Sequence, residues 1–192
     1  MRKLLNHWTM KSAILLGVCL AATAVASAQA VETAQRGAVL TPFFQTTILR
    51  PDWGQPNNMG YTVGVDYTRF LRSILQPSLE LRYTTANGSV VSEHSFIGGL
   101  KLEASIFGIH PYATLLAGNG DITFTHPIGN YYGDNSFVYS LGGGAEFKLY
   151  SSLKLRADFT QQHWDLDPYI LTPMTFSVGL AYGLPFHRGP IE

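Results

Sequence analysis

The amino-acid sequence predicts an all-β fold in which eight antiparallel strands form a closed up-and-down barrel. The composition is rich in glycine (19 residues) and in aromatic residues (24 Phe, Tyr and Trp), whereas helix signals are nearly absent. Several segments alternate apolar residues with small or polar ones, which is the period of a strand with two unlike faces. The connections between these segments alternate between long and short, as successive hairpins do around a barrel.

A targeting segment precedes the strands. Three basic residues are followed by an apolar stretch at 12–26 and by the small-residue sequence Ala-Ser-Ala at 26–28, which together have the form of a secretory signal peptide. An uncleaved N-terminal anchor is the alternative, and Ala-Gln-Ala at 28–30 is a second possible cleavage site. The predicted organisation is a signal peptide (1–28), an N-terminal periplasmic segment (29–38), a barrel (39–186) and a periplasmic tail (187–192).

Charge and cysteine content exclude several classes of function. Removing the signal peptide takes away Arg2, Lys3 and Lys11, which leaves ten Lys and Arg against thirteen Asp and Glu, a net charge of −3. No basic excess remains to bind nucleic acid. The single cysteine, Cys19, lies within the signal peptide, so the mature chain is expected to have no disulfide and no thiolate metal site. No run of 18 apolar residues follows the signal, so no transmembrane helix is expected.

Eight segments are expected as strands, and most have the 9–11 residues that a tilted strand needs to cross a bilayer. They are residues 40–50, 59–68, 76–85, 94–104, 109–118, 135–149, 152–164 and 174–184. Five alternate cleanly. The parity of 40–50 and of 109–118 is ambiguous, and Ile97 breaks the alternation of the fourth segment. Pro111 cannot donate a ladder hydrogen bond, so we expect it near a strand start or at a bulge.

The lengths of the connections predict which end of the barrel carries the loops. Connections 51–58, 86–93, 119–134 and 165–173 are long, and 119–134 is the longest, whereas 69–75, 105–108 and 150–151 are shorter. In outer-membrane barrels the short turns lie in the periplasm and the long loops lie outside. Because the first connection is long and the strand number is even, both chain termini are expected on the periplasmic side.

The two faces of the alternating strands differ in charge. Ten charged residues fall on the face opposite the apolar one: Asp66, Glu80, Arg82, Lys101, Glu103, Glu146, Lys148, Lys154, Arg156 and Asp158. They comprise five acids and five bases. A buried unpaired charge costs several kcal/mol, so a balanced set is what a narrow interior requires. Eight strands leave an interior just wide enough for side chains to fill. We therefore predict a charged, plugged interior and not an open channel.

The apolar face is then expected to meet lipid, because a closed barrel satisfies every backbone group within a bilayer. Five aromatic residues near strand ends are candidates for interfacial girdles: Tyr67, Tyr83, Tyr150, Trp164 and Phe186. One alternative is a secreted or periplasmic lipocalin-like barrel, in which the apolar face points inward around an apolar ligand. That alternative also explains a signal peptide and eight strands.

Four stretches carry a resemblance to a known family: GYTVGVDYTRFL (60–71), FVYSLGGGAEFKL (137–149), SLKLRADFTQQ (152–162) and FSVGLAYGL (176–184). They resemble the small outer-membrane β-barrel family that includes the outer membrane protein A-like transmembrane domain. The resemblance implies an outer-membrane location and insertion by the outer-membrane assembly machinery. Chains of this family usually finish on an aromatic residue that the machinery recognises. Here PFHRGPIE follows Leu184, and Phe186 is the candidate for that residue.

His163 is the candidate for chemistry. Its position resembles that of the catalytic His in eight-stranded enzymes that deacylate lipid A, in which a Ser lies two residues away. Here that position holds Asp165, and residues 154–175 contain no Ser, so the local nucleophile is missing. We therefore predict no catalytic residue, cofactor or metal site. The lipid A-modifying enzyme stays as the weaker alternative.

The predicted function is that of a non-enzymatic, monomeric outer-membrane barrel with a structural or adhesive role. Its expected partners are outer-membrane lipids, the assembly machinery and an unknown extracellular ligand at the outer loops, with no role for nucleic acid.

Overall fold

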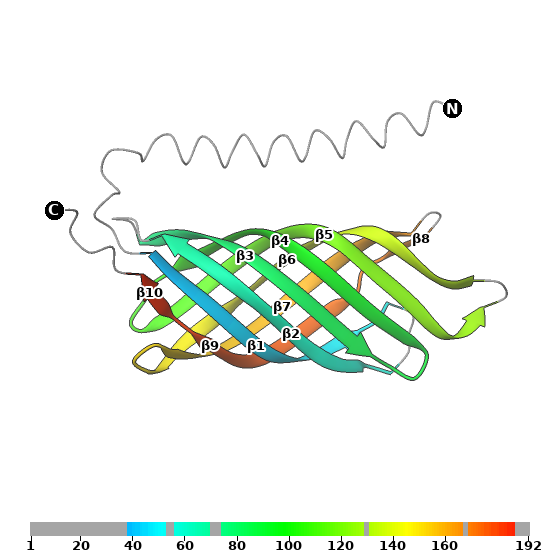
Figure 1. The fold of residues 1–192 in the computed structure, drawn as a ribbon, viewed down its shortest axis with the longest axis horizontal. Helices are drawn as coiled ribbons and strands as arrows, with labels where there is room; N and C mark the ends of the chain where they lie inside the picture. The colour runs from blue at the N-terminus through cyan, green and yellow to red at the C-terminus, as the bar shows by residue number, and fades with distance from the viewer. Residues whose placement is uncertain (1–37, 53–55, 70–73, 129–130, 167–168, 187–192) are drawn as a thin grey trace, which may run out of the picture. The chain divides into compact units, whose positions relative to one another are not determined.

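The computed structural model describes residues 38–52, 56–69, 74–128, 131–166 and 169–186, which form a closed antiparallel barrel (Figure 1). Its strands are β1 (Ala38–Arg50), β2 (Asn58–Arg69), β3 (Leu75–Asn87), β4 (Val91–Ala104), β5 (Ile109–Ile128), β6 (Tyr131–Tyr150), β7 (Leu153–Leu166), β8 (Tyr169–Leu171), β9 (Met174–Tyr182) and β10 (Leu184–Phe186). Strands β1 to β7 pair in chain order. Strand β9 pairs with both β7 and β1 and so closes the ring.

The barrel wall is formed by β1 to β7 and β9, and each of these positions around the wall is called here a stave. The two short strands do not add staves. Strand β10 follows β9 and pairs with β1, where Ala38 lies opposite Phe186, so β9 and β10 share the last stave. Strand β8 pairs only with the last three residues of β7. The predicted all-β, eight-stranded, up-and-down barrel is therefore confirmed.

Several predicted segments lie outside the described residues. These are the signal peptide (1–28), residues 29–37 of the N-terminal segment and the tail (187–192). Among the residues that are described, no helix has the length and apolar character needed to cross a membrane.

The longest predicted loop is wrong, because most of residues 119–134 continue the hairpin of β5 and β6. Asp121 pairs with Asn135 and Ile128 pairs with Tyr131, with an irregularity in register between Thr123 and Ile128. The abundant Gly and Asn of this stretch predict a loop, but its inner and outer positions still alternate. Ile122 is buried on the inner face, whereas Thr123 is exposed on the outer face.

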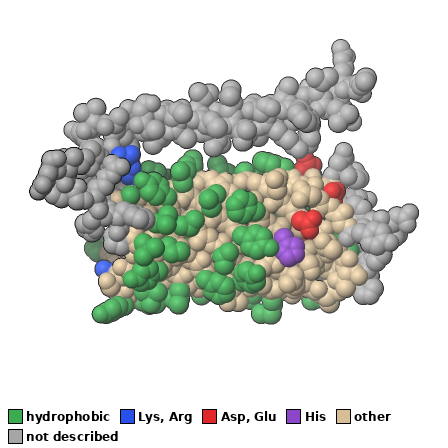
Figure 2. All heavy atoms as spheres, viewed as in Figure 1, with side chains coloured by type: hydrophobic (Ala, Val, Ile, Leu, Met, Phe, Trp, Pro, Cys, Tyr) green, Lys and Arg blue, Asp and Glu red, His purple; other side chains and the backbone are tan. Residues whose placement is uncertain are grey.

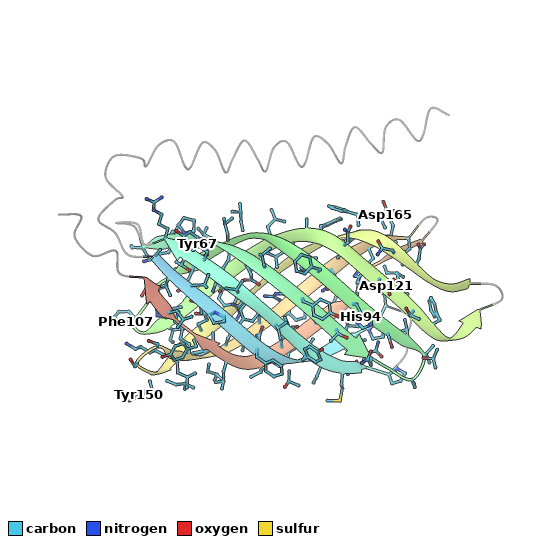
Figure 3. All side chains as sticks on the ribbon, in the orientation of Figure 1. Tyr67, His94, Phe107, Asp121, Tyr150 and Asp165 are labelled. Carbon is cyan, nitrogen blue, oxygen red and sulfur yellow. The ribbon has the colours of Figure 1, made fainter. Side chains whose placement is uncertain are left out.

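The two ends of the barrel differ. The C-terminal ends of β2, β4 and β6 and the N-terminal ends of β3, β5 and β7 lie at one end of the barrel, called here the short-turn end. In Figure 3, Phe107 and Tyr150 lie at this end on the left, whereas His94, Asp121 and Asp165 lie toward the opposite, long-loop end. The long β5–β6 hairpin and β8 belong to the long-loop end (Figure 1).

The burial pattern resolves the strands whose parity the sequence left open. In β1 the side chain of Phe43 is buried and that of Phe44 is exposed, so odd positions face inward. In β5 the inward positions are even and include Tyr112 and Leu116. Strand β4 faces inward at odd positions along its whole length, so Ile97 continues the alternation as an apolar residue on the inner face.

Candidate functional site: the lumen and the outer wall

The outer wall carries a belt of exposed apolar side chains. Figure 2 shows them gathered over the short-turn end and the middle of the barrel. The members of this apolar belt include Phe44, Ile48, Tyr61, Tyr67, Leu79, Leu81, Phe96, Leu100, Leu102, Leu115, Leu141, Phe147, Phe159, Phe176, Leu180 and Tyr182. An outer wall of this kind is opposite to the lipocalin-like alternative, in which the apolar face points inward.

Arg156 lies at the centre of the lumen and is completely buried. Its Nη1 donates to Asp66 Oδ2 at 2.8 Å, and its Nη2 donates to Glu80 Oε2 at 2.9 Å. Strand β7, which carries Arg156, lies four staves from β3, which carries Glu80, so this contact crosses the lumen. Charge-assisted hydrogen bonds of this length are the strong class, and they offset the removal of these charges from water.

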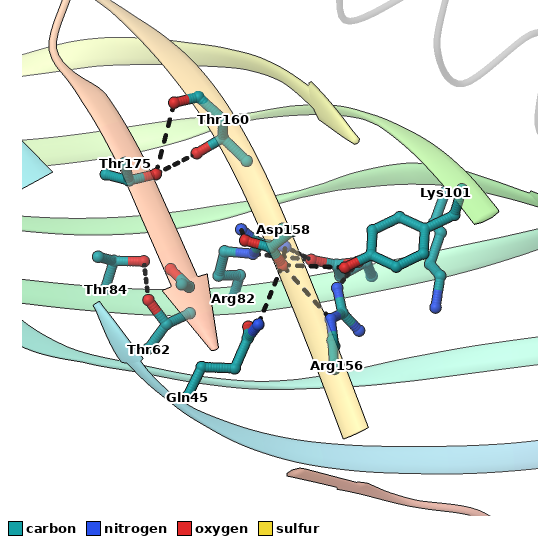
Figure 4. Close-up of polar contacts among 12 residues, drawn as sticks. Gln45, Thr62, Arg82, Thr84, Lys101, Arg156, Asp158, Thr160 and Thr175 are labelled. Atoms are coloured by element: carbon teal, nitrogen blue, oxygen red, sulfur yellow. Dashed lines mark hydrogen bonds and ion pairs between the residues drawn. The ribbon is translucent and has the colours of Figure 1, made fainter. Parts of the chain in front are cut away.

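A second crossing pair lies beside the first (Figure 4). The Nη2 of Arg82 on β3 donates to Asp158 Oδ2 on β7 at 3.1 Å, and its Nε donates to Glu80 Oε1 at 2.8 Å. Tyr112 Oη and Gln45 Nε2 also donate to Asp158 Oδ2, at 3.0 and 3.3 Å. Asp158 is therefore bonded from three other strands, which joins β1, β3, β5 and β7 across the interior.

Lys101 links the network toward the short-turn end. Its Nζ donates to Asp66 Oδ2 at 2.7 Å and to Glu146 Oε1 at 2.6 Å. Glu146 also accepts from Lys154 Nζ at 2.7 Å, and the side chain of Lys154 is 22% exposed. The Nζ of Lys101 is also 3.2 Å from Glu103 Oε2. The chain of contacts thus runs from the buried centre to the edge of the lumen.

The predicted place of Lys148 in this network is wrong, because its side chain is exposed. Lys148 lies opposite Lys154 in the ladder of β6 and β7, and the register shifts only beyond it, so its exposure comes from its place near the short-turn end of β6 and not from a change of parity. A base that alternation did not single out lies near the same edge. His110 Nδ1 is 2.9 Å from Glu103 Oε1.

Two aromatic rings enclose the central guanidinium. The Cζ of Arg156 is 3.9 Å from the ring centroid of Phe43 and 4.8 Å from that of Tyr112. The ring of Tyr112 also has Lys101 Nζ at 4.4 Å from its centroid. Stacked guanidinium groups keep their in-plane donors free for carboxylates. Sequence reasoning did not find these aromatic residues, since both belong to the strands of ambiguous parity.

A layer of hydroxyl groups follows the charged residues toward the long-loop end. Thr47 Oγ1 is 2.7 Å from Thr62 Oγ1 and 2.9 Å from Ser177 Oγ, and Thr62 Oγ1 is 3.0 Å from Thr84 Oγ1. Thr160 and Thr175 make a further hydroxyl pair between β7 and β9. These short side chains satisfy one another across five adjacent staves, from β3 through β2, β1 and β9 to β7, and need no charged partner (Figure 4).

The interior becomes apolar near the long-loop end. Nine buried residues form one cluster, called here the apolar cluster: Val91, Ile97, Leu116, Ile122, Phe124, Val138, Trp164, Leu166 and Leu171. Trp164 is 1% exposed and its Nε1 donates to Gln162 Oε1 at 2.9 Å. Its prediction as an interfacial aromatic is therefore wrong. Its even position in β7 faces inward, and its indole fills the interior instead of meeting the membrane interface.

One carboxyl group shares this apolar region. Glu93 is 3% exposed, and its Oε2 has no hydrogen-bond partner among the described residues. Its neighbours across the ladders are Ala86 and Ile122. Glu93 lies beyond the apolar belt, since the adjacent outward positions of β4 are the polar residues Ser92 and His94. Burial raises the pKa of Glu93 from 4.5 to about 7.

The outer wall around the apolar cluster is polar. The outward residues of β4 to β7 at this level are mainly polar, with Phe137 and Tyr139 as aromatic exceptions on β6. The polar ones are Ser92, His94, Asn119, Asp121, Thr123, Asn135, Gln161, His163 and Asp165, all of them exposed or half-buried. We call this part of β4 to β7, together with β8, the distal section. Figure 2 shows the change on one face, where the green belt gives way to acidic and His side chains. Both faces of the wall therefore reverse polarity along the barrel.

The remaining predicted residues lie at several levels. Tyr67 and Tyr150 are exposed on the outer wall, whereas Tyr83 is half-buried with its Oη 3.4 Å from His94 Nδ1. For Phe186 the structure describes the backbone pairing with Ala38.

The candidate for chemistry, His163, faces outward and is half-buried. It stacks on Tyr139, with ring centroids 4.8 Å apart. Among the described residues, no group of three or more His, Cys, Asp or Glu is arranged to hold a metal ion.

Comparison with solved structures identifies the fold. Neisserial surface protein A has a TM-score of 0.52 at 9% identity, and the match covers 76% of this chain and 96% of that protein. Ail, the attachment invasion locus protein of Yersinia pestis, has a TM-score of 0.51 at 14% identity, with 78% and 99% covered. The match is the same for Ail in complex with the heparin analogue sucrose octasulfate. No protein-family model and no curated protein sequence matches the chain. The barrel thus has the fold of small outer-membrane β-barrels.

Proposed function

We propose that this chain is a non-enzymatic outer-membrane protein whose barrel spans the membrane and whose distal section makes contacts outside the cell. The carrying observation is the reversal of polarity on both faces of the wall. In the belt, apolar side chains point outward over a charged lumen, which suits lipid. In the distal section, polar side chains point outward over an apolar core, which suits water.

We further propose that the buried network closes the lumen to ions. The crossing contacts of Arg156 with Glu80 and of Arg82 with Asp158 support this, since each joins opposite staves through atoms about 3 Å apart. An eight-stranded barrel has an interior that side chains can fill. With five acidic and four basic residues in mutual contact, no row of like charges remains to select one ion.

The distal section is the proposed contact surface. The fold is shared with an attachment protein of Yersinia pestis, and this supports an adhesive or structural role here. The described charges at the long-loop end are mainly acidic: Asp52, Asp121, Asp134 and Asp165, with Arg50 as a base. Such a surface repels polyanions and favours a neutral or basic partner surface.

Membrane fractionation tests the location. We expect the protein in the carbonate-washed outer-membrane fraction, with gel mobility that changes when the sample is boiled. Recovery of a folded barrel in the soluble fraction would reject the proposal.

Planar-bilayer recording tests the closed lumen. We expect no stable single-channel steps with the wild-type barrel, and such steps would contradict closure.

A binding assay tests the charge argument. We expect no retention on immobilised heparin at low salt, and retention that falls with added salt would show that the acidic surface does not govern binding.

A further inference from the structure

The connection between β4 and β5 is a tight two-residue turn with an unusual first residue. Ile106 and Ile109 exchange both backbone hydrogen bonds at 2.9 Å, with Phe107 and Gly108 between them. The φ angles are +48° at Phe107 and +82° at Gly108. Two positive φ angles define the hairpin turn that favours Asn-Gly or Asp-Gly. A bulky aromatic residue in the left-handed region is strained, so local turn chemistry does not explain Phe107.

The side chain of Phe107 receives no compensation from the barrel, because it is fully exposed. The other connections at the short-turn end repeat this feature. Ile74 is 73% exposed beside the β2–β3 connection, and Tyr150 is 79% exposed at the β6–β7 turn. Each of the three connections at this end therefore has a large, exposed apolar or aromatic side chain within it or beside it. For Phe107, strain together with full exposure points to a surrounding medium that stabilises the side chain, and exposure alone points the same way for Ile74 and Tyr150.

The apolar belt continues into these turns. On β4 and β5, Leu100, Leu102 and Ile109 lead to Phe107. At the opposite end of the same strands the belt stops at His94 and Asn119. At the long-loop end, exposed apolar side chains remain on other strands: Met59 of β2 lies opposite Ile48 of the belt, and Met174 of β9 and Ile170 of β8 are exposed. The belt is therefore displaced toward the short-turn end on β4 and β5.

Strand geometry gives the same result. The outward apolar run of β4 from Phe96 to Ala104 covers eight residue steps of about 3.3 Å. At a tilt of about 40°, this run has a height of about 20 Å, which is less than the apolar band of about 25 Å of outer-membrane barrels. The turn that carries Phe107 supplies the missing height. A belt that ended before the turns would leave part of the hydrocarbon layer against polar wall.

We propose that the short-turn end is seated within the inner leaflet, with Ile74, Phe107 and Tyr150 inserted among phospholipid chains at the membrane interface. This inference rests on the proposed membrane location. It assigns the tips of the turns to lipid instead of periplasmic water, and it makes the long-loop end the part of the barrel that projects. Continuity with the belt favours phospholipid over a periplasmic protein as the occupant.

Spin labels test the position of the turn. The chain has one cysteine, Cys19, so Cys19→Ser gives a background for single-cysteine variants. We compare Phe107→Cys with Leu115→Cys in the belt and Thr123→Cys in the distal section. Each full-length protein is spin-labelled and reconstituted in phosphatidylethanolamine–phosphatidylglycerol vesicles. The measurement is collision with oxygen, which concentrates in lipid, relative to collision with a water-soluble nickel chelate.

We expect the oxygen-to-nickel ratio at position 107 to approach that at 115 and to exceed that at 123 several-fold. A ratio at 107 like that at 123, with a high ratio at 115, would overturn the inference and leave the membrane location intact. Low ratios at both 107 and 115 would reject the membrane location itself. A label at 107 that neither reagent reaches would indicate a protein contact and would also overturn the inference.

A pair of turn substitutions tests the side chain of Phe107 itself. Asn suits positive φ, and Ser151 has φ +41° in the β6–β7 turn, so Ser151→Asn is the matched control. We expect Ser151→Asn to leave the urea midpoint in vesicles unchanged or higher, and Phe107→Asn to lower it. If Phe107→Asn raises the midpoint as Ser151→Asn does, the aromatic ring has no role in lipid.

Discussion

The indole of Trp164 occupies the space in which a side chain at position 120 would stand. A Cβ added to Gly120 would lie 2.4 Å from Cη2 and 2.5 Å from Cζ3 of Trp164, and 2.7 Å from Cγ2 of Val138. Real Cβ atoms do not approach heavy atoms this closely. The glycine on β5 and the tryptophan on β7 are thus complementary parts of the apolar cluster across the lumen, with β6 between them.

Gly120→Ala is therefore expected to destabilise the barrel by about 1–3 kcal/mol, the usual effect of overpacking a tight core. Urea unfolding in vesicles measures the change. Gly183→Ala is the control, because its Cβ would meet Val39 at 3.4 Å, an ordinary contact, and a near-zero effect is expected. Trp164→Phe should lose less stability in the Gly120→Ala background than in the wild type. Additive effects would show that the two positions do not share one space.

The burial of Trp164 also predicts a spectroscopic result. In vesicles with brominated acyl chains, a girdle tryptophan is quenched, whereas one inside the barrel is not. We expect the fluorescence of a variant with Trp8→Phe and Trp53→Phe, in which Trp164 is the single tryptophan, to be blue-shifted and insensitive to brominated lipid. Adding Leu115→Trp to that variant should bring strong quenching as a positive control. Quenching without that addition would place the indole on the lipid side.

The sequence determined the fold because alternation is a local property. Five strands could be assigned two faces from their own residues, and the alternating connection lengths then fixed an up-and-down order. The loop prediction for 119–134 failed because Gly, Asn and Asp recur along this stretch, although Ile122 and Phe124 keep the inner alternation. Cross-strand pairing, which composition does not reveal, extends β5 and β6.

The charged lumen was predicted only in part, because alternation shows which side of the wall a residue faces but not which residue it contacts. The inward side of Glu80 or Arg156 follows from strand parity. Their partnership does not, because they are 76 residues apart and their contact depends on how the strands are staggered around the barrel. Lys148 was misplaced because parity gives the side of the wall on which a residue lies but not its exposure at the end of the strand. Trp164 was misplaced because a residue-type preference was set above alternation, although the outward side of His163 already required the next residue to face inward.

The central cation of the network gives the third prediction. Arg156→Met leaves Asp66 and Glu80 facing each other in the lumen without the guanidinium that separates them. Removal of one partner from a buried ion network costs about 3–5 kcal/mol, so a large fall in the urea midpoint is expected. Lys154→Met is the matched control at the partly exposed edge, where about 0–1 kcal/mol is expected. Equal effects at the two positions would argue against a network centred on Arg156.

Glu93 gives the last prediction, a dependence of stability on pH. Burial raises the pKa of Glu93 to about 7, so the folded barrel retains a proton that the unfolded chain releases above its ordinary pKa of 4.5. The contribution of Glu93 to folding stability does not change with pH below about 4.5. Folding stability then falls as the pH rises from about 4.5 to about 7. The full loss corresponds to about 3 kcal/mol, at 1.36 kcal/mol per pKa unit.

In Glu93→Gln the amide does not ionise, so this pH-dependent component of stability should be absent. The measurement is the urea midpoint in phosphatidylcholine vesicles from pH 4 to 8 for both proteins. Because the two proteins differ only at position 93, the difference between the two curves isolates Glu93. We expect the variant to gain stability relative to the wild type as the pH rises, with the gain levelling off above pH 7. Parallel curves would show that the Glu93 carboxyl finds water or a partner when it ionises.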